Sequence, residues 1–273
     1  MNRQQQGFSL LEVMVVMTIF LVVAGAVFEL LNVSQQRYRS EQQVLESFQG
    51  ARLGMDLMVR DIHNAGYPPP YTFPGNLPSP PTPPAFPGGI WTVPTNAPAA
   101  IQNSFAVGVV GIAGGVVDPT CRVNSAINPC AIPNPWDVVL ELDIDPEDGL
   151  AQVEWVRYFL RRPGGAPVST LFRAVAPKAA GADAGVAVVS NIPFVDNVVQ
   201  NRGAAVGPGN PAVFIYQCDP SQIITLGGND CLAEHVKTIY ITLQVQGNIP
   251  DIKTGQFQRI TVQGAASRMN PSR

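Results

Sequence analysis

The feature that most constrains the fold is an apolar run at residues 8–31 of the 273-residue chain. The polar residues within it are Ser9, Glu12, Thr18 and Glu29. About 24 residues of α-helix extend roughly 36 Å, which is enough to cross the hydrocarbon core of a bilayer, about 30 Å thick. Because a carboxylate at membrane depth costs about 3 kcal/mol on insertion scales, the position of Glu12 needs a physical reason.

The helical pattern continues through residues 32–66. Apolar residues recur there at intervals typical of one helix face, namely Leu45, Phe48, Met55, Val59 and Ile62, with Arg52 in the intervening position. This spacing predicts an amphipathic helix with one packing face. The Ala65-Gly66 pair and the prolines from Pro68 onward supply a stop signal, so we predict one helix from about Phe8 to Ala65.

A proline-rich segment follows at residues 67–100, with twelve prolines between Pro68 and Pro98. We expect polyproline II or extended loop there, without internal hydrogen bonds. One interpretation is a ligand for a proline-recognition module. We favour a loop that lies over the head, because aromatic residues would help it to pack, namely Tyr71, Phe73, Phe86 and Trp91.

Strand signals dominate the remainder, residues 101–273. In "WDVVLELDID" apolar residues alternate with polar or solvent-side partners, and "AQVEWVRYFLRR" after the turn "PEDG" predicts a hairpin. "HVKTIYITLQVQ" places Ile239, Ile241, Leu243 and Val245 on one face, and "GQFQRITVQGAA" gives a closing strand. Shorter strands are expected at Ser169–Val175 and Ala212–Gln217. The predicted fold is α+β, a long helix packed on an antiparallel sheet.

Charge and motif content argue against two classes of function, nucleic-acid binding and catalysis. The net charge is −3, with charged residues at 14%, so the chain has no electrostatic footprint for nucleic acid. Nucleophile-elbow, metalloprotease and P-loop motifs are absent from the sequence, so we expect no enzyme. Glu141 and Glu154 lie on predicted strands, where a solvated face would explain them.

The N-terminal motif carries a family resemblance. The residues "GFSLLEV", from Gly7 to Val13, followed by a long apolar helix, resemble the leader and first helix of type IV pilins and type II secretion pseudopilins. The resemblance implies that residues 1–7 are a leader, that a prepilin peptidase cuts between Gly7 and Phe8, and that Phe8 is then N-methylated. Glu12 falls at the fifth mature position, where the family has a glutamate.

The resemblance also implies a role for Glu12. Cleavage creates a charged amine at Phe8, which is buried when the helices bundle. A carboxylate from a neighbouring subunit can pair with this amine, so that two costly buried charges neutralise each other. A secretory signal cut near Ala24–Ala26 leaves Glu12 unexplained, and a plain membrane anchor has no use for the Gly-Phe-Ser context.

Later segments resemble one branch of the family. "RLGMDLMVRDIHNAGY", "VEWVRYFLRR", "STLFRAV", "FVDNVV" and "SRMN" are similar to PilW-type minor pilins, and the J-type minor pseudopilin of type II secretion shares much of this order. Chain length and the proline-rich insert favour PilW. The implied role is to initiate type IV pilus assembly and enter the fibre. The alternatives are a secretion pseudopilus and a tip adhesin or binding module on a pilin stalk.

The implied partners are other minor pilins, the major pilin, the prepilin peptidase, an inner-membrane assembly platform and, before assembly, the lipid bilayer. Arginine flanks both ends of the apolar run, at Arg3 on one side and at Arg37 and Arg39 on the other, so charge does not decide the topology. Family likeness places the chain in the bacterial inner membrane as a single-pass protein with a periplasmic head, and at the cell surface after assembly.

The four cysteines, Cys121, Cys130, Cys218 and Cys231, lie on the side where disulfides form. Of the three pairings we prefer the sequence-local ones, Cys121–Cys130 and Cys218–Cys231. We expect no cofactor and no zinc site. The acidic stretch "DIDPEDG" offers Asp143, Asp145 and Asp148 as calcium candidates, but it lacks the EF-hand spacing, and we favour a solvated turn.

Replacing Gly7 with a bulky residue is expected to block processing, because the peptidase cuts directly after this glycine. On a gel the chain should keep the mobility of the precursor. An unchanged mature mass in the variant would contradict the cleavage site.

Overall fold

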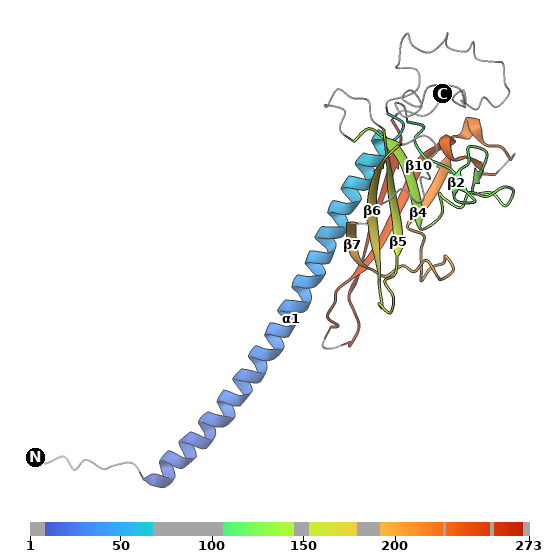
Figure 1. Cartoon of the computed structure of the whole chain (residues 1–273). Helices are drawn as coiled ribbons and strands as arrows, with labels where there is room; N and C mark the ends of the chain where they lie inside the picture. The colour runs from blue at the N-terminus through green and yellow to red at the C-terminus, as the bar shows by residue number, and fades with distance from the viewer. Residues whose placement is uncertain are drawn as a thin grey trace, which may run out of the picture. The chain divides into compact units, whose positions relative to one another are not determined.

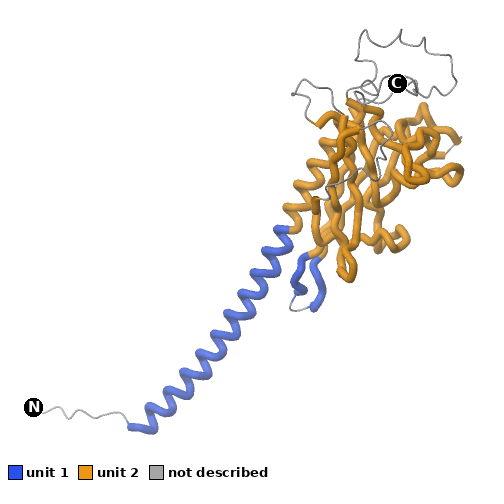
Figure 2. Tube along the Cα trace, viewed as in Figure 1, with its two compact units in different colours: residues 1–46, 247–258 blue, residues 47–246, 259–273 orange. Residues whose placement is uncertain are grey.

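A computed structural model describes residues 9–67, 106–144, 153–178, 192–225, 228–251 and 254–269. The chain divides into two compact units, coloured separately in Figure 2. The first comprises residues 1–46 and 247–258, and the second comprises residues 47–246 and 259–273. The proline-rich segment, the turn "PEDG" and residues 1–8 lie outside the described residues, so the expectations for them remain predictions.

One helix, α1, spans Leu10–Asn64 and contains 55 residues, about 83 Å of helix (Figure 1). It begins where the Ser9 carbonyl accepts hydrogen bonds from the backbone N–H groups of Glu12 and Val13. It ends at Asn64, two residues before Gly66, whose φ of +90° lies in a region that glycine adopts at little cost. The prediction of one uninterrupted helix is therefore confirmed over the described residues.

The packing face of α1 is made by small and apolar residues, namely Ala51, Met55, Met58 and Ile62, which are at most 4% exposed. Phe48 and Val59, also predicted for this face, are half-buried. The prediction was wrong for Leu45, which is 54% exposed. Leu45 precedes Ala51 by six residues, and at about 100° per residue it points some 120° away from the buried stripe.

A seven-stranded antiparallel sheet packs against this face, in the order β11-β10-β7-β6-β5-β4, with β8 also paired to β10 (Figure 1). The strands are β4 (Asp137–Leu142), β5 (Glu154–Arg161), β6 (Ser169–Pro177), β7 (Ile192–Val198), β8 (Phe214–Cys218), β10 (Val236–Gln246) and β11 (Arg259–Ser267). Two small sheets pair β1 (Ile112–Ala113) with β2 (Val116–Val117) and β3 (Arg122–Val123) with β9 (Cys231–Leu232). The α+β architecture predicted from the sequence is the observed one.

The predicted alternation holds best in β10. Its inward residues are Ile239, Ile241, Leu243 and Val245, each at most 1% exposed. The predicted pairing of "WDVVLELDID" with "AQVEWVRYFLRR" is also observed, as β4 against β5 from Asp137–Phe159 to Leu142–Glu154. The closing strand forms β11, which pairs with β10 over its whole length. The alternation in β10 and β11 could be predicted because each strand has one face toward the core and the other toward solvent.

The alternation expected in β4 was wrong, because all six of its residues are buried. Its second face packs against the loop of residues 106–136, where Val139 joins a separate apolar cluster with Val110, Ile112, Ile132 and Trp155. Strand β7 was not predicted at all. It contains Pro193 and pairs with β6 through register shifts, and proline within a run argues against a strand.

Close contact between α1 and the sheet requires small residues. A Cβ atom built on Gly54 would lie 2.5 Å from Cγ2 of Val195 in β7, and one built on Gly264 in β11 would lie 2.8 Å from Sδ of Met55. Real Cβ atoms do not approach carbon atoms so closely, so these glycines set the distance between the helix and the sheet.

Gly54→Ala is therefore expected to lower the free energy of unfolding by about 1–3 kcal/mol, because the added methyl overpacks the interface. Gly50→Ala is the matched control: nothing lies within 4 Å of its Cβ position, so alanine should stabilise the helix by about 0.5–1 kcal/mol. Urea unfolding of both variants measures the difference. Equal effects at the two positions would refute the tight contact.

Candidate assembly segment

The first half of α1 exposes almost all of its apolar side chains. Leu10 is 79% exposed, Phe20 65% and Phe28 72%, and the same holds along the run from Leu10 to Leu31. By length and composition this helix is able to cross a membrane. A folded soluble chain rarely leaves so large a contiguous apolar surface uncovered, so the segment is a site for lipid or for other helices.

Glu12 lies in the first turn of α1, with its side chain exposed and its backbone N–H bonded to the Ser9 carbonyl at 3.0 Å. The hydroxyl of Thr18 is satisfied within the helix, because it donates to the Met14 carbonyl at 2.8 Å. Such internal bonding is what a polar residue needs at membrane depth. Gly7 and Phe8 lie outside the described residues, so their relation to Glu12 rests on sequence.

A family model described as the prokaryotic N-terminal methylation motif matches residues 2–28. The match includes Gly7, Phe8 and Glu12. It supports a type IV pilin-like protein. No curated protein matches the chain, and no solved structure does. The motif indicates prepilin peptidase processing and assembly with other pilins. With the exposed helix, it also indicates membrane anchoring.

The pilin-like head contains both disulfides that we preferred from spacing, Cys121–Cys130 and Cys218–Cys231. They lie beside one another, because β3 follows Cys121 directly and Val123 pairs with Cys231 in β9. Apolar side chains are also exposed in this region of the chain, with Val116 of β2 at 61% and Ile127, in the loop that the Cys121–Cys130 disulfide closes, at 69%. The Cys121–Cys130 cross-link therefore constrains a loop that exposes an apolar side chain.

Of the calcium candidates only Asp143 lies within the described residues. It is 8% exposed, and its backbone N–H bonds to the Tyr67 carbonyl. Asp145 and Asp148 lie outside the described part of the chain. Among the residues that the structure describes, no cluster of three acidic, histidine or cysteine side chains could hold a metal ion.

A buried polar network joins α1 to the sheet. The hydroxyl of Tyr158 in β5 donates to Oδ2 of Asp61 at 2.6 Å, and Arg173 in β6 donates to the same oxygen at 3.0 Å. Burial and the neighbouring Asp61 carboxylate raise the pKa of Tyr158, so it stays protonated and donates. Sequence reasoning missed this site, because nothing local predicts that residues 61, 158 and 173 meet.

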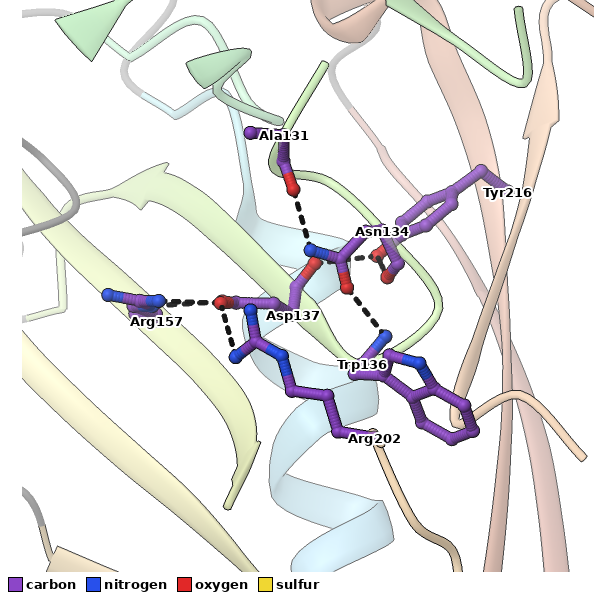
Figure 3. Close-up of polar contacts among 7 residues, drawn as sticks. All are labelled: Ala131, Asn134, Trp136, Asp137, Arg157, Arg202 and Tyr216. Atoms are coloured by element: carbon purple, nitrogen blue, oxygen red, sulfur yellow. Dashed lines mark hydrogen bonds and ion pairs between the residues drawn. The ribbon is translucent and has the colours of Figure 1, made fainter. Parts of the chain in front are cut away.

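A second network surrounds Asp137 at the start of β4 (Figure 3). Arg157 donates to both carboxylate oxygens, and Arg202 lies 3.7 Å from Oδ2. The Tyr216 hydroxyl donates to the backbone carbonyls of Asn134 and Asp137, at 2.9 and 3.1 Å. Burial raises the pKa of Asp137, and the hydrogen bonds and charge of Arg157 oppose that rise. The network ties the loop before β4 to β8.

Glu141 was expected on a solvated strand face, and this expectation was wrong. It is 3% exposed, because the loop of residues 106–136 covers β4. Its carboxylate accepts hydrogen bonds from the indole of Trp155, the ammonium of Lys178 and the backbone N–H of Val107, at 2.9–3.0 Å. A buried charge with three donors is a structural element of the head.

A further buried charge, Arg268, lies where β10 begins and β11 ends. Arg268 is 5% exposed and donates to the backbone carbonyls of Val107 and Glu234. Burial raises the pKa of Glu234 from its ordinary value of 4.5 to about 7, although the charge of Arg268 acts in the opposite direction. Burial also lowers the pKa of the adjacent His235.

Glu234 should therefore make the head less stable as pH rises. In the folded chain the Glu234 carboxyl keeps its proton up to about pH 7, whereas in the unfolded chain it loses the proton near pH 4.5. The free energy of unfolding therefore has its full value below pH 4.5 and falls between pH 4.5 and 7. The free energy of unfolding of Glu234→Gln, minus that of the native chain, should therefore rise by about 3 kcal/mol from pH 4.5 to pH 8. Urea unfolding across this range measures the difference, and a constant difference would contradict the prediction.

Proposed function

We propose that this chain is a minor pilin of the PilW type, which helps to initiate assembly of a type IV pilus and is incorporated into it. The observation that carries the proposal is the exposed apolar half of α1 with Glu12 in its first turn, inside the matched methylation motif. Such a helix has two environments that cover it, a bilayer before assembly and a bundle of like helices afterwards.

The proposed mechanism starts with cleavage between Gly7 and Phe8, followed by methylation of the Phe8 amine. In the bundle this amine and the Glu12 carboxylate of a neighbouring subunit pair in an apolar environment. Either charge alone would be costly there, so the pair favours subunits whose axial position brings the two together. The pairing thus fixes register while hydrophobic contact supplies the attraction.

The PilW assignment is supported by where the similar segments pack. "RLGMDLMVRDIHNAGY", "VEWVRYFLRR" and "STLFRAV" contain Asp61, Tyr158 and Arg173, which form one network. "FVDNVV" contributes Val195 against Gly54, and "SRMN" contributes the backbone N–H of Met269, which bonds to the His63 carbonyl. Every segment of the resemblance therefore packs around the second half of α1.

A second candidate is a binding module at the tip of the fibre. It is favoured by the exposed apolar side chains of Val116 in β2 and of Ile127 in the loop that the Cys121–Cys130 disulfide closes. Loss of adhesion or uptake with piliation intact, after Val116 and Ile127 are replaced by serine, would support it. The same assembly physics also serves a J-type pseudopilin, and genes for secretion rather than pili beside this one would favour that system.

Glu12→Ala tests the mechanism. The precursor should still be processed and remain in the membrane, but recruitment into the assembly should fall about tenfold or more, because the buried amine loses its partner. Glu29→Ala is the matched control, since it removes an exposed glutamate from the same helix, and it should be recruited nearly as well as the native chain. Quantification of the chain in sheared filaments measures both.

Normal assembly of Glu12→Ala in cells that lack the native gene would overturn the proposed mechanism. Equal defects in the Glu12 and Glu29 variants would also count against it, because they would indicate a general requirement for charge in the helix.

A further inference from the structure

The two edges of the main sheet differ in whether their backbone groups are covered. The β4 edge is covered, because Val110 donates to the Val139 carbonyl and Glu141 donates to the Gly108 carbonyl, at 3.0 and 2.7 Å. The N–H of Gly66 adds a bond to the Glu141 carbonyl at the same edge. At the opposite edge, β11 pairs with β10 alone among the strands that the structure describes.

The register shows which backbone groups of β11 point outward. Arg268 donates to the Lys237 carbonyl, and Gly247 donates to the Gln258 carbonyl, so the even-numbered residues between them bond to β10. Since antiparallel pairs alternate, the N–H and C=O groups of the odd-numbered residues face away from the sheet. These residues are Arg259, Thr261, Gln263, Ala265 and Ser267, all with exposed side chains. The next odd residue, Met269, donates to the His63 carbonyl of α1.

This edge lacks the usual protection against pairing with another chain. Natural edge strands carry proline, lysine, inward charges or bulges, or they are short. β11 has nine residues, no proline and no lysine, and between Ile260 and Ser267 it has no charge. Its register with β10 is continuous, without a bulge. Such a strand is suited to receive another extended chain through backbone hydrogen bonds.

The direction of β11 restricts the partner. Gly264 lies against Met55 and Met269 bonds to His63, so β11 and this part of α1 run in the same direction. Antiparallel pairing of two β11 strands would therefore direct the two helices oppositely. Copies anchored in one membrane with their heads on the same side cannot do this. A strand that pairs with β11 in antiparallel orientation must therefore come from a different part of a neighbouring head.

We propose that β11 is a docking edge for an extended strand from the head of another pilin-like subunit, which pairs with it in antiparallel orientation. That the partner is a pilin-like subunit rests on the proposed function. The strand pairing itself is independent of the Glu12 mechanism. The helices would then supply the attraction between subunits, and the β11 edge would select which head lies beside this one.

Thr261→Pro in the full-length chain tests the docking edge. Proline removes one outward N–H, while the bonds of Ile260 and Val262 to β10 remain. The amount of the chain in sheared filaments and detergent-extracted complexes should fall about tenfold. Thr261→Val, which keeps the N–H and the shape, is the matched control and should assemble as the native chain does. Processing and the urea midpoint of both variants should match those of the native chain.

Hydrogen exchange keeps the proposal falsifiable if Thr261→Pro folds poorly. In the native chain in detergent micelles, the amides of Thr261, Gln263 and Ala265 should exchange rapidly while those of Ile260 and Val262 are protected. In the assembled state all five should be protected. Rapid exchange of the three outward amides after assembly, or native assembly by a folded Thr261→Pro chain, would overturn the docking edge alone. A native chain that joins no pilin-like assembly would overturn both this inference and the proposed function.

Discussion

One helix serves two environments, and the rest of the structure depends on the second half of α1 staying packed against its sheet. Ala51, Gly54 and Met58 allow that contact, and the Asp61–Tyr158–Arg173 network closes it with buried hydrogen bonds. Because these contacts hold the head to the helix, the first half of α1 is free to leave its apolar side chains exposed. The contacts that stabilise the head and the apolar surface that we propose for assembly thus lie on separate parts of one helix.

The head adds selectivity to this general attraction. Apolar helix packing is non-directional and would accept many similar helices. A backbone edge such as β11 accepts only an extended chain whose backbone hydrogen-bonding groups match its spacing. Elsewhere in the head, the β4 edge is covered, and the two disulfides lie beside the small β3–β9 sheet. In our account the helix provides affinity, and the head decides which neighbour is adjacent.

Much of the fold could be predicted from the sequence, because local patterns determine it. The absence of proline before Pro68 predicted α1, and the alternation around Ile239 and Leu243 predicted β10. The predictions failed where tertiary covering decides the outcome. β4 is buried on both faces because the segment of residues 106–136 folds back over its second face, and β7 forms in spite of Pro193. The networks around Asp61 and Asp137 depend on long-range contacts that no local pattern shows. Glu12 was recognised through family resemblance, since physics alone showed only that its position is costly.

The central claim is that Glu12 is tolerated because cleavage before Phe8 creates a charged amine, which pairs with the Glu12 carboxylate in the assembled state. Intact-mass measurement of the chain extracted from sheared, functional filaments tests this most directly. Our account predicts a polypeptide that starts at Phe8 and carries one additional methyl group. A polypeptide that still carries residues 1–7 in the working assembly would contradict it.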